Sequence, residues 1–494
     1  MPVPHLVPEP THLSVLPGRF TFDATTALKV SPGADAAAGL LRTLLGPATG
    51  LPLPARPDGT VVLVLDRALV GLGDEGYGLT VGTEGILLRA ARPQGLLAGV
   101  QTLRQLLPVE ALRPEPVPGV AWSVPCAQIT DVPRFPWRGS MLDVARRFRP
   151  VSFLRRYVDL LALHKLNVLH LHLTDDQGWR MPVGALPRLT EVGGLPHGGA
   201  YTRSELTGLV AYAAERGVTV VPEIEMPGHV RAALAAYPEL GNHPGRTYDV
   251  WDRWGVCDSV LGVHDEALAF CRTVLDEVMD VFPSPYVHVG GEECPTVEWH
   301  ASAAARRRAA EEGLPGPDAL RGWFMERIGR HLLDAGRRPL GWTENGADLP
   351  ACFTVMPWRD ADHGRTAVRR GHQVVMAPHR TTYLDYPQSS SPAEPPGQAG
   401  QVVDLRAVHG NDPAPADWTP EEAERVLGSQ AQLWTEYVPT AAHAEYLTFP
   451  RLCALAEVVW TGRHDWPGFQ DRLRHHRNRL DALGVPRRLA PASP

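Results

Sequence analysis

The sequence contains almost no lysine, few cysteines and no long hydrophobic run. Lys29 and Lys165 are the only lysines among 48 basic residues, so arginine supplies the other 46, a bias to which we attach no function. The six cysteines form no CxxC pair, a distribution typical of reduced and mostly buried thiols. No stretch approaches the roughly 18 uninterrupted apolar residues that a transmembrane helix requires.

The charge balance is not that of a nucleic-acid-binding protein. The 494 residues carry 48 basic and 55 acidic side chains, a formal charge of -7, so no overall basic field attracts nucleic acid or an anionic membrane. We therefore expect no nucleic-acid partner and no membrane partner. Residues 1–10 have neither the cationic start nor the apolar segment of a secretion signal. We expect a cytoplasmic protein, or a secreted one if the natural chain begins earlier; the oligomeric state stays open.

The composition is that of a globular protein with a sizeable core. Hydrophobic residues make up 44% and charged residues 21% of the chain, and the length suits about two to four domains. Residues 1–130 are predicted to form a small α+β domain, because strand-like segments at 61–65, 77–81 and 85–90 precede a helical pattern at 95–107. Prolines and glycines between residues 114 and 136 then indicate a domain boundary.

Residues 131–494 alternate between short apolar runs and amphipathic segments. The strand candidates are residues 140–144, 168–173, 218–225, 286–291, 338–342, 353–358, 372–377 and 428–434. Repeated βα units predict an α/β fold, either a doubly wound sheet or a (β/α)8 TIM-type barrel. No glycine-rich GxGxxG segment follows the first strand, so we favour the barrel over the doubly wound sheet. We expect this barrel to be the catalytic domain.

Side chains with chemical functions follow these strands, where (β/α)8 barrels form their active sites. They are Asp143, Arg146, Asp175, Asp176, Glu223, Glu225, His229, Glu292, Glu293, Trp342, Glu344, Trp358, Tyr383, Asp385, Trp434 and Glu436. A single acid at a strand end is usually a helix cap or an ion-pair partner, but that does not explain the whole set. Indole rings stack on the C–H faces of pyranoses and carboxylates accept hydrogen bonds from hydroxyls, so the set predicts a sugar pocket.

Glu292 and Glu293 are adjacent and follow two glycines. Neighbouring side chains of a strand face opposite ways, so both glutamates serve one pocket only if the strand has ended, and Gly290 and Gly291 supply that break. Repulsion between two close carboxylates raises one pKa, which leaves one group protonated and the other ionised near neutral pH. Glycoside cleavage needs that combination of an acid and an anion.

His170 and His172 provide an alternative hypothesis. An HxH pair on a strand points both imidazoles one way, which suits a metal-dependent amidohydrolase. Both histidines lie inside the strand, before its end near Thr174, and for that reason we favour structural packing.

Residues 131–461 resemble the family 20 glycoside hydrolases, the β-N-acetylhexosaminidases. The matching segments, in order, are RGSMLDVARRF, LALHKLNVLHLHLTDDQGWR, VPEIEMPGH, VHVGGEECPTVEW, TYLDY, LGSQAQLWTEY and TFPRLCALAEVVW. The preceding α+β unit is similar to the small domain that commonly precedes this catalytic barrel. The resemblance implies a retaining, exo-acting enzyme that removes terminal β-linked N-acetylglucosamine or N-acetylgalactosamine, with no cofactor and no metal, in which the substrate's own acetamido group is the nucleophile.

The resemblance also implies a role for each matching residue. Glu293 matches the general acid/base, Glu292 the carboxylate that orients the acetamido group, and Tyr383 the hydroxyl that bonds its carbonyl. Trp342, Trp358 and Trp434 match the aromatic walls, Arg146 the group that holds the 3- and 4-hydroxyls, Asp385 and Glu436 the acceptors for the outer hydroxyls, and Asp175 and His229 a carboxylate and an imidazole directed at the acid.

Four positions differ from the usual pattern of that family. Glu292 and Glu225 stand where Asp is frequent, Arg147 where His is frequent, and Thr343 where an acid is common. One extra methylene moves the charge of Glu292 by about 1 Å, which is enough to slow a reaction that depends on precise positioning. A non-catalytic, glycan-binding barrel is therefore a third hypothesis.

Overall fold

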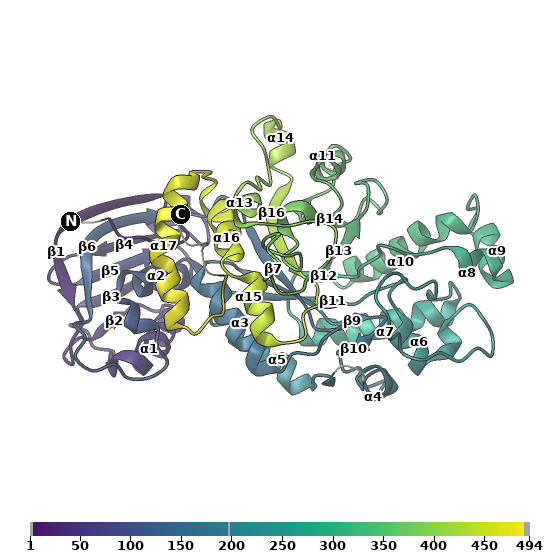
Figure 1. The fold of residues 1–494 in the computed structure, drawn as a ribbon, viewed down its shortest axis with the longest axis horizontal. Helices are drawn as coiled ribbons and strands as arrows, with labels where there is room; N and C mark the ends of the chain where they lie inside the picture. Colours follow the sequence, from purple (N-terminus) through teal and green to yellow (C-terminus); the bar gives the residue numbers. More distant parts are fainter. Residues whose placement is uncertain (1–2, 196–197, 489–494) are drawn as a thin grey trace.

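The computed structural model describes residues 3–195 and 198–488, and its N-terminal part is a six-stranded mixed sheet in the order β1-β6-β4-β5-β3-β2 (Figure 1). Its elements are β1 (His12–Thr21), β2 (Leu28–Val30), α1 (Asp35–Thr49), β3 (Val61–Leu65), β4 (Tyr77–Val81), β5 (Ile86–Ala90), α2 (Pro93–Leu106) and β6 (Ser123–Asp131). β2, β3 and β5 run parallel, whereas β4 pairs antiparallel with β5 and β6. The predicted α+β arrangement is confirmed.

Hydrophobic patterning explains which of these elements could be predicted. The β-branched run Val61–Leu65 and the alternating strands β4 and β5 form as predicted, and α2 starts at Pro93, a favourable first helical position. Strands β1, β2 and β6 and helix α1 were not predicted. β1 contains a Pro-Gly pair with a register shift between Val15 and Arg19, which is tolerated because β1 is an edge strand. β6 falls within the segment that we predicted to be a boundary.

The second part is a closed barrel of eight parallel strands, as predicted. The strands are β7 (Trp137–Asp143), β8 (Val168–His172), β11 (Thr219–Glu223), β12 (Tyr286–His288), β13 (Arg338–Thr343), β14 (Thr354–Pro357), β15 (Val374–Met376) and β16 (Val426–Leu433). Most of their residues are buried, because helices cover the outside and side chains fill the inside.

Helices surround the barrel and extra segments emerge from its loops (Figure 1). The longer helices are α3 (Val151–Leu163), α5 (Arg203–Ala214), α7 (Asp265–Val281), α9 (Ala303–Glu311), α10 (Leu320–Asp334), α11 (Ala361–Arg369), α15 (Ala441–Thr448), α16 (Arg451–Thr461) and α17 (Trp466–Ala482). Shorter elements are the β9 (Thr174–Asp175) and β10 (Gly178–Trp179) hairpin, α4 (Arg188–Gly193), α6 (Arg231–Ala236), α8 (Val297–Ala301), α12 (His379–Thr382), α13 (Leu405–His409) and α14 (Pro420–Ala423).

A buried ion pair joins the sheet to the barrel. Lys165, at the end of α3, donates to Asp131 of β6 at 2.6 Å, and both side chains are at most 1% exposed. Asp131 also accepts hydrogen bonds from Tyr77 of β4 and from the indole of Trp460 of α16. Two strands of the sheet, β4 and β6, therefore share one fully buried polar cluster with α16 and with the segment that follows α3.

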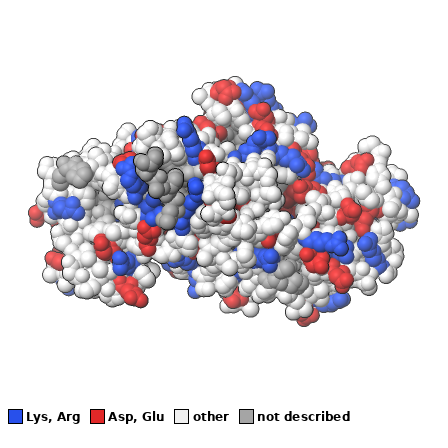
Figure 2. Space-filling model, in the orientation of Figure 1, with Lys and Arg blue, Asp and Glu red and all other residues white. Residues whose placement is uncertain are grey.

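The C-terminal helix α17 lies between the two parts (Figure 1). Arg479 of α17 donates to the backbone carbonyls of His5 and Gln105, at 2.8 Å each. Basic side chains gather near this helix in Figure 2, whereas acidic and basic side chains are scattered over the rest of the visible face. Within the described residues, no helix has the length and hydropathy needed to span a bilayer.

Candidate active site

A cavity of about 150 Å³ opens at the carboxyl ends of the barrel strands. It is lined by Arg146, His229, Glu292, Glu293, Trp342, Trp358, Tyr383, Asp385, Tyr386, Gln398, Trp434 and Glu436. Every residue to which the family resemblance assigned a role lines this cavity except Asp175, which lies behind the wall and contacts Arg146 and His229. The other acids at the strand ends, which are Asp143, Asp176, Glu223, Glu225 and Glu344, are not among the lining residues. Tyr386 and Gln398 are additions that the sequence did not suggest.

Four aromatic side chains form continuous walls. The rings of Trp358 and Tyr383 are stacked with centroids 6.4 Å apart, and Trp434 lies 6.2 Å from Tyr383 and 6.0 Å from Trp342. The indole nitrogen of Trp342 donates to Glu223 at 2.6 Å, which fixes this ring at the floor of the barrel. The walls can hold a methyl group and the C–H face of a pyranose.

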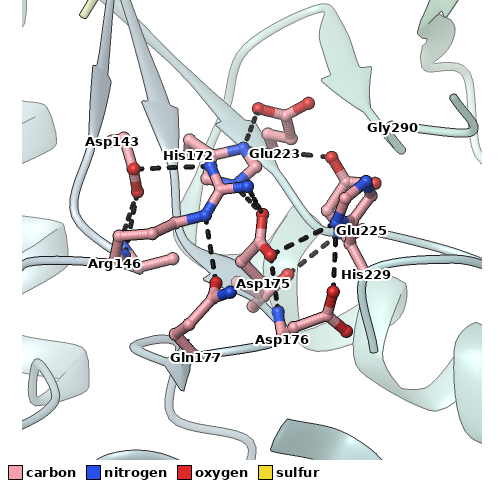
Figure 3. Close-up of polar contacts among 12 residues, drawn as sticks. Asp143, Arg146, His172, Asp175, Asp176, Gln177, Glu223, Glu225, His229 and Gly290 are labelled. Carbon is pink, nitrogen blue, oxygen red and sulfur yellow. Dashed lines mark hydrogen bonds and ion pairs between the residues drawn. The ribbon is translucent and has the colours of Figure 1, made fainter. Parts of the chain in front are cut away.

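Arg146 is held rigidly at one side of the cavity (Figure 3). Its Nε donates to Gln177 at 3.1 Å, its Nη2 lies 2.8 Å from Asp175, and its Nη1 lies 3.4 Å from Asp143. The guanidinium also stacks on Trp434 with its Cζ 5.0 Å from the ring centroid. These contacts orient the remaining donor capacity for hydroxyl groups of a ligand.

Asp385 and Glu436 supply acceptors near Arg146. Asp385 is 5% exposed, and its Oδ1 is buried without a hydrogen-bond partner among the described residues. Burial raises the pKa of both carboxyls above the ordinary range, well above it for Asp385. A buried acceptor without a partner is costly, so a hydroxyl group of a bound sugar would satisfy it.

Glu292 and Glu293 lie on an irregular turn, as predicted. β12 ends at His288, and Gly290 (φ +61°), Gly291 (φ +96°) and Glu293 (φ +42°) have positive φ angles. The backbone N–H of Glu293 donates to Glu344 at 2.9 Å, which holds the turn. Because the strand has ended, both carboxyl groups line the same cavity.

The two glutamates have opposite pKa shifts. Burial, reinforced by Glu223 and Glu293, raises the pKa of Glu292 to about 8. Burial also acts on Glu293, but the hydrogen bond and charge of His229 outweigh it and, with Arg359, lower the pKa of Glu293. These opposite shifts agree with the predicted coexistence of one protonated and one ionised carboxyl, and they favour the proton on Glu292 in the free protein.

Asp175, His229 and Glu293 form a chain of charges (Figure 3 shows its first two members). His229 Nδ1 lies 3.3 Å from Asp175 Oδ1 and 3.3 Å from Asp176 Oδ2, and its Nε2 lies 3.6 Å from Glu293 Oε2. Although burial lowers the pKa of His229, the neighbouring carboxylates raise it well above its ordinary value. A charged imidazole therefore stands next to Glu293.

Glu225 lies directly beneath the turn that carries the glutamate pair (Figure 3). A Cβ atom at Gly290 would come within 1.7 Å of Glu225 Oε2, so only glycine fits there. Both Glu225 oxygens are buried without a hydrogen-bond partner among the described residues. Burial raises the pKa of Glu225 well above its ordinary value, and repulsion from the carboxylate of Glu223 adds to this shift.

His170 and His172 are occupied by side chains of the barrel interior. His172 contacts Glu223 through Nδ1 and Asp175 through Nε2 at 3.0 Å. The Nδ1 of His170 bonds Gln430 at 2.8 Å, and its Nε2 lies 3.1 Å from Glu223. Both imidazoles thus belong to the buried network under the cavity, as the packing interpretation predicted.

Arg359, Tyr386 and Gln398 are the site residues that sequence reasoning missed. Tyr386 and Gln398 come from the long loop after β15, which folds back so that the Gln398 N–H donates to the Asp385 carbonyl at 2.9 Å. Arg359 follows Trp358 and lies 3.8 Å from Glu293. Arg359 directly follows Trp358 and Tyr386 directly follows Asp385, so adjacency to a candidate residue is the sequence signal that could have identified these two.

Comparisons with known proteins agree with this geometry. Residues 135–463 match glycosyl hydrolase family 20, catalytic domain, and residues 3–132 match glycosyl hydrolase family 20, domain 2. A β-hexosaminidase from Porphyromonas gingivalis is 36% identical over 505 residues, which cover 97% of this chain and 64% of that protein. The chain thus spans less than two thirds of that relative.

Solved structures share the overall fold. The exo-β-N-acetylglucosaminidase of family 20 from Vibrio harveyi, in complex with N-acetylglucosamine, has a TM-score of 0.90 and 32% identity, covering 98% of this chain and 78% of its own. The family 20 β-N-acetylhexosaminidase from Streptomyces coelicolor A3(2) has a TM-score of 0.89 and 34% identity, covering 100% and 99%. The chain described here belongs to glycosyl hydrolase family 20.

Proposed function

We propose that the protein is a retaining exo-β-N-acetylhexosaminidase that releases terminal β-linked N-acetylglucosamine or N-acetylgalactosamine. The observation that carries this proposal is the adjacent pair Glu292 and Glu293 inside a small cavity walled by Trp342, Trp358, Tyr383 and Trp434. The cavity offers an acid, an anion and an apolar cage within one sugar-binding space. The similarity to family 20 enzymes supports the same conclusion.

The reaction proceeds in two steps in this proposal. The carbonyl oxygen of the substrate's acetamido group attacks the anomeric carbon, while Glu293 gives its proton to the departing glycosidic oxygen. Glu292 balances the positive charge of the resulting oxazolinium ion, and the hydroxyl of Tyr383 bonds the acetamido oxygen. Glu293 then takes a proton from water, and this water attacks the anomeric carbon. The attack opens the oxazolinium ring and gives a product with retained configuration.

The residues that would bind the sugar hydroxyls support the exo specificity in this proposal. Arg146, Asp385 and Glu436 form a wall of donors and acceptors for the outer hydroxyls of one terminal sugar. A tethered nucleophile held by aromatic walls gains effective molarity that a free nucleophile lacks. The proposal covers both configurations at C4 of the sugar, which are those of N-acetylglucosamine and N-acetylgalactosamine.

A matched pair of substrates tests the proposal. An aryl β-N-acetylglucosaminide should be hydrolysed far faster than the aryl β-glucoside with the same leaving group, because only the former contains the nucleophile. Equal or faster hydrolysis of the glucoside would contradict substrate assistance. Tight binding of the sugar without turnover during long incubation would instead support the non-catalytic hypothesis.

The cytoplasmic location remains a prediction. The cysteines of the described residues are free, and four of the six are buried, which is consistent with a reducing compartment. Fractionation of the source cells, followed by an activity assay of each fraction, tests it.

A further inference from the structure

Arg359 lies at the rim of the cavity, beside the proposed general acid. It follows Trp358 at the end of β14, and its Cζ lies 4.1 Å from the centroid of the Trp358 ring. Its Nη2 lies 3.8 Å from Glu293 Oε1. The Arg359 side chain is 44% exposed, so it adjoins both the cavity wall and solvent.

The two cations near Glu293 lie at different depths. His229 approaches Oε2 and is 5% exposed, whereas Arg359 approaches Oε1 and is the exposed neighbour. The leaving group must lie next to the Glu293 carboxyl to receive its proton, and it must extend out of the cavity toward solvent. Arg359 therefore occupies the position at which a leaving group would pass.

The guanidinium of Arg359 is oriented by its neighbours but keeps a hydrogen-bond donor that is not in use. Its Nε and Nη2 donate to Glu344 Oε2 at 3.0 and 2.9 Å, and the other oxygen of Glu344 accepts from the Glu293 backbone. Among the described residues, Nη1 has no hydrogen-bond partner. Arg359 thus keeps donor capacity, while Glu344 and Trp358 hold its orientation.

The reaction changes the charge that Arg359 faces. In the free protein, ionised Glu293 is one of its two neighbouring carboxylates. Glu293 must be protonated before it can act as an acid, and Arg359 then loses one of these anionic neighbours. An anion on the leaving group would take that place, and its repulsion of ionised Glu293 would favour the protonated acid.

We propose that Arg359 binds the leaving group of the substrate and selects aglycones that carry an anionic group, such as a sugar carboxylate, close to the scissile bond. This inference rests on the proposed function, because it assumes cleavage with Glu293 as the acid. Arg359 is a specificity residue in this proposal and takes no proton from the substrate.

The test uses two aryl β-N-acetylglucosaminides that differ only in a carboxylate or a carboxamide at the 3-position of the phenyl ring. We expect the wild-type protein to favour the carboxylate in kcat/KM by a factor of about three to five at low salt, as for an exposed ion pair. This preference should fall as sodium chloride screens the pair. R359Q should abolish the preference, and R359K should keep part of it.

The control is R330Q, which removes the same charge from the exposed face of α10, where Arg330 is 71% exposed. It should keep the wild-type preference. A purely structural role of Arg359 would lower kcat/KM for both substrates and leave their ratio unchanged, so an unchanged ratio in R359Q would overturn the proposal, as would a wild-type ratio near one at low salt. Failure of the wild-type protein to cleave either substrate would instead contradict the proposed function.

Discussion

The carboxyl groups of Glu292 and Glu293 have the reverse proton distribution in the free protein from the one that the reaction requires. Burial keeps Glu292 protonated, with a pKa of about 8, whereas His229 and Arg359 keep Glu293 ionised. A bound sugar would cover the 30% of the Glu293 side chain that is now exposed and so raise its pKa. Positive charge on the substrate would favour ionised Glu292. Binding of the substrate would therefore favour both the protonation of Glu293 and the ionisation of Glu292.

The E293Q and E292Q variants should respond differently to the leaving group. E293Q removes the acid, so we expect kcat/KM to fall by a factor of about 10² to 10⁴ for an alkyl or sugar leaving group, and much less for an activated nitrophenyl group that needs no proton. Steady-state kinetics with a series of leaving groups measures this difference.

E292Q is the matched comparison, because it changes the same functional group one residue earlier. Its loss should be similar for all leaving groups, since oxazolinium formation is impaired whatever departs. If E293Q lowered the rates of good and poor leaving groups equally, Glu293 would not be the acid.

The short strand β12 and the turn after it set the geometry of the site. β12 spans only Tyr286–His288, and the positive φ angles of Gly290, Gly291 and Glu293 turn both carboxyl groups into one cavity. A non-glycine residue such as Glu293 at φ +42° costs about 1 to 2 kcal/mol, which the surrounding contacts must offset. The element is thus strained where it carries the reacting groups.

Substitution of Gly290 by alanine should lower kcat/KM by more than the accompanying loss of folding stability can explain. The new Cβ would displace Glu225, which lies beneath the turn, and so move Glu292 and Glu293. We expect at least about a 100-fold loss of kcat/KM, the scale that misplacement by about 1 Å produces. Kinetic assays, together with chemical denaturation, separate the two effects.

Gly336 provides the control for backbone strain. Its φ is +75°, close to the +61° of Gly290, but a Cβ there meets no atom within 4 Å. G336A should therefore lose about 1 kcal/mol of stability and keep wild-type kinetics. Equal kinetic losses in G290A and G336A would refute this explanation.

The sequence predicted the elements whose hydrophobic pattern is local. All eight barrel strands are short apolar runs, and the acids and tryptophans that follow them mark the site. Helix α1 and strand β6 escaped prediction, since α1 contains a proline and β6 lies in a proline-rich segment. Gln398 could not be predicted, because only the folding of a long loop brings it to the cavity, and the contact of Arg359 with Glu293 is likewise visible only in the structure.

At the scale of the whole molecule, the two parts share their buried polar groups. Asp131 accepts from Lys165, Tyr77 and Trp460, so one carboxylate connects the sheet to the barrel. Arg479 of α17 fastens the C-terminal helix to the first part. We therefore expect the protein to unfold in one cooperative transition, with the N-terminal sheet acting as a support for the barrel.

D131N should destabilise the molecule without changing its chemistry. It leaves the buried ammonium of Lys165 without a counter-charge, which costs about 3 to 5 kcal/mol when one partner of a buried pair is removed. Urea denaturation should show this loss, while kcat and KM stay near wild type at low temperature. D74N, at a position 82% exposed, is the control and should change stability by less than about 0.5 kcal/mol. A stable D131N protein would show that the junction depends on other contacts.

The burial of Lys165 also has a practical consequence. Since the chain contains only two lysines and Lys165 is enclosed at the junction, Lys29 is the single side-chain amine that solvent can reach. Lys29 lies on β2, an edge strand of the N-terminal sheet, which is separate from the barrel that carries the cavity. Among the side chains, an amine-directed reagent would therefore attach a dye only to Lys29, with the α-amino group of the chain as the one other reactive amine.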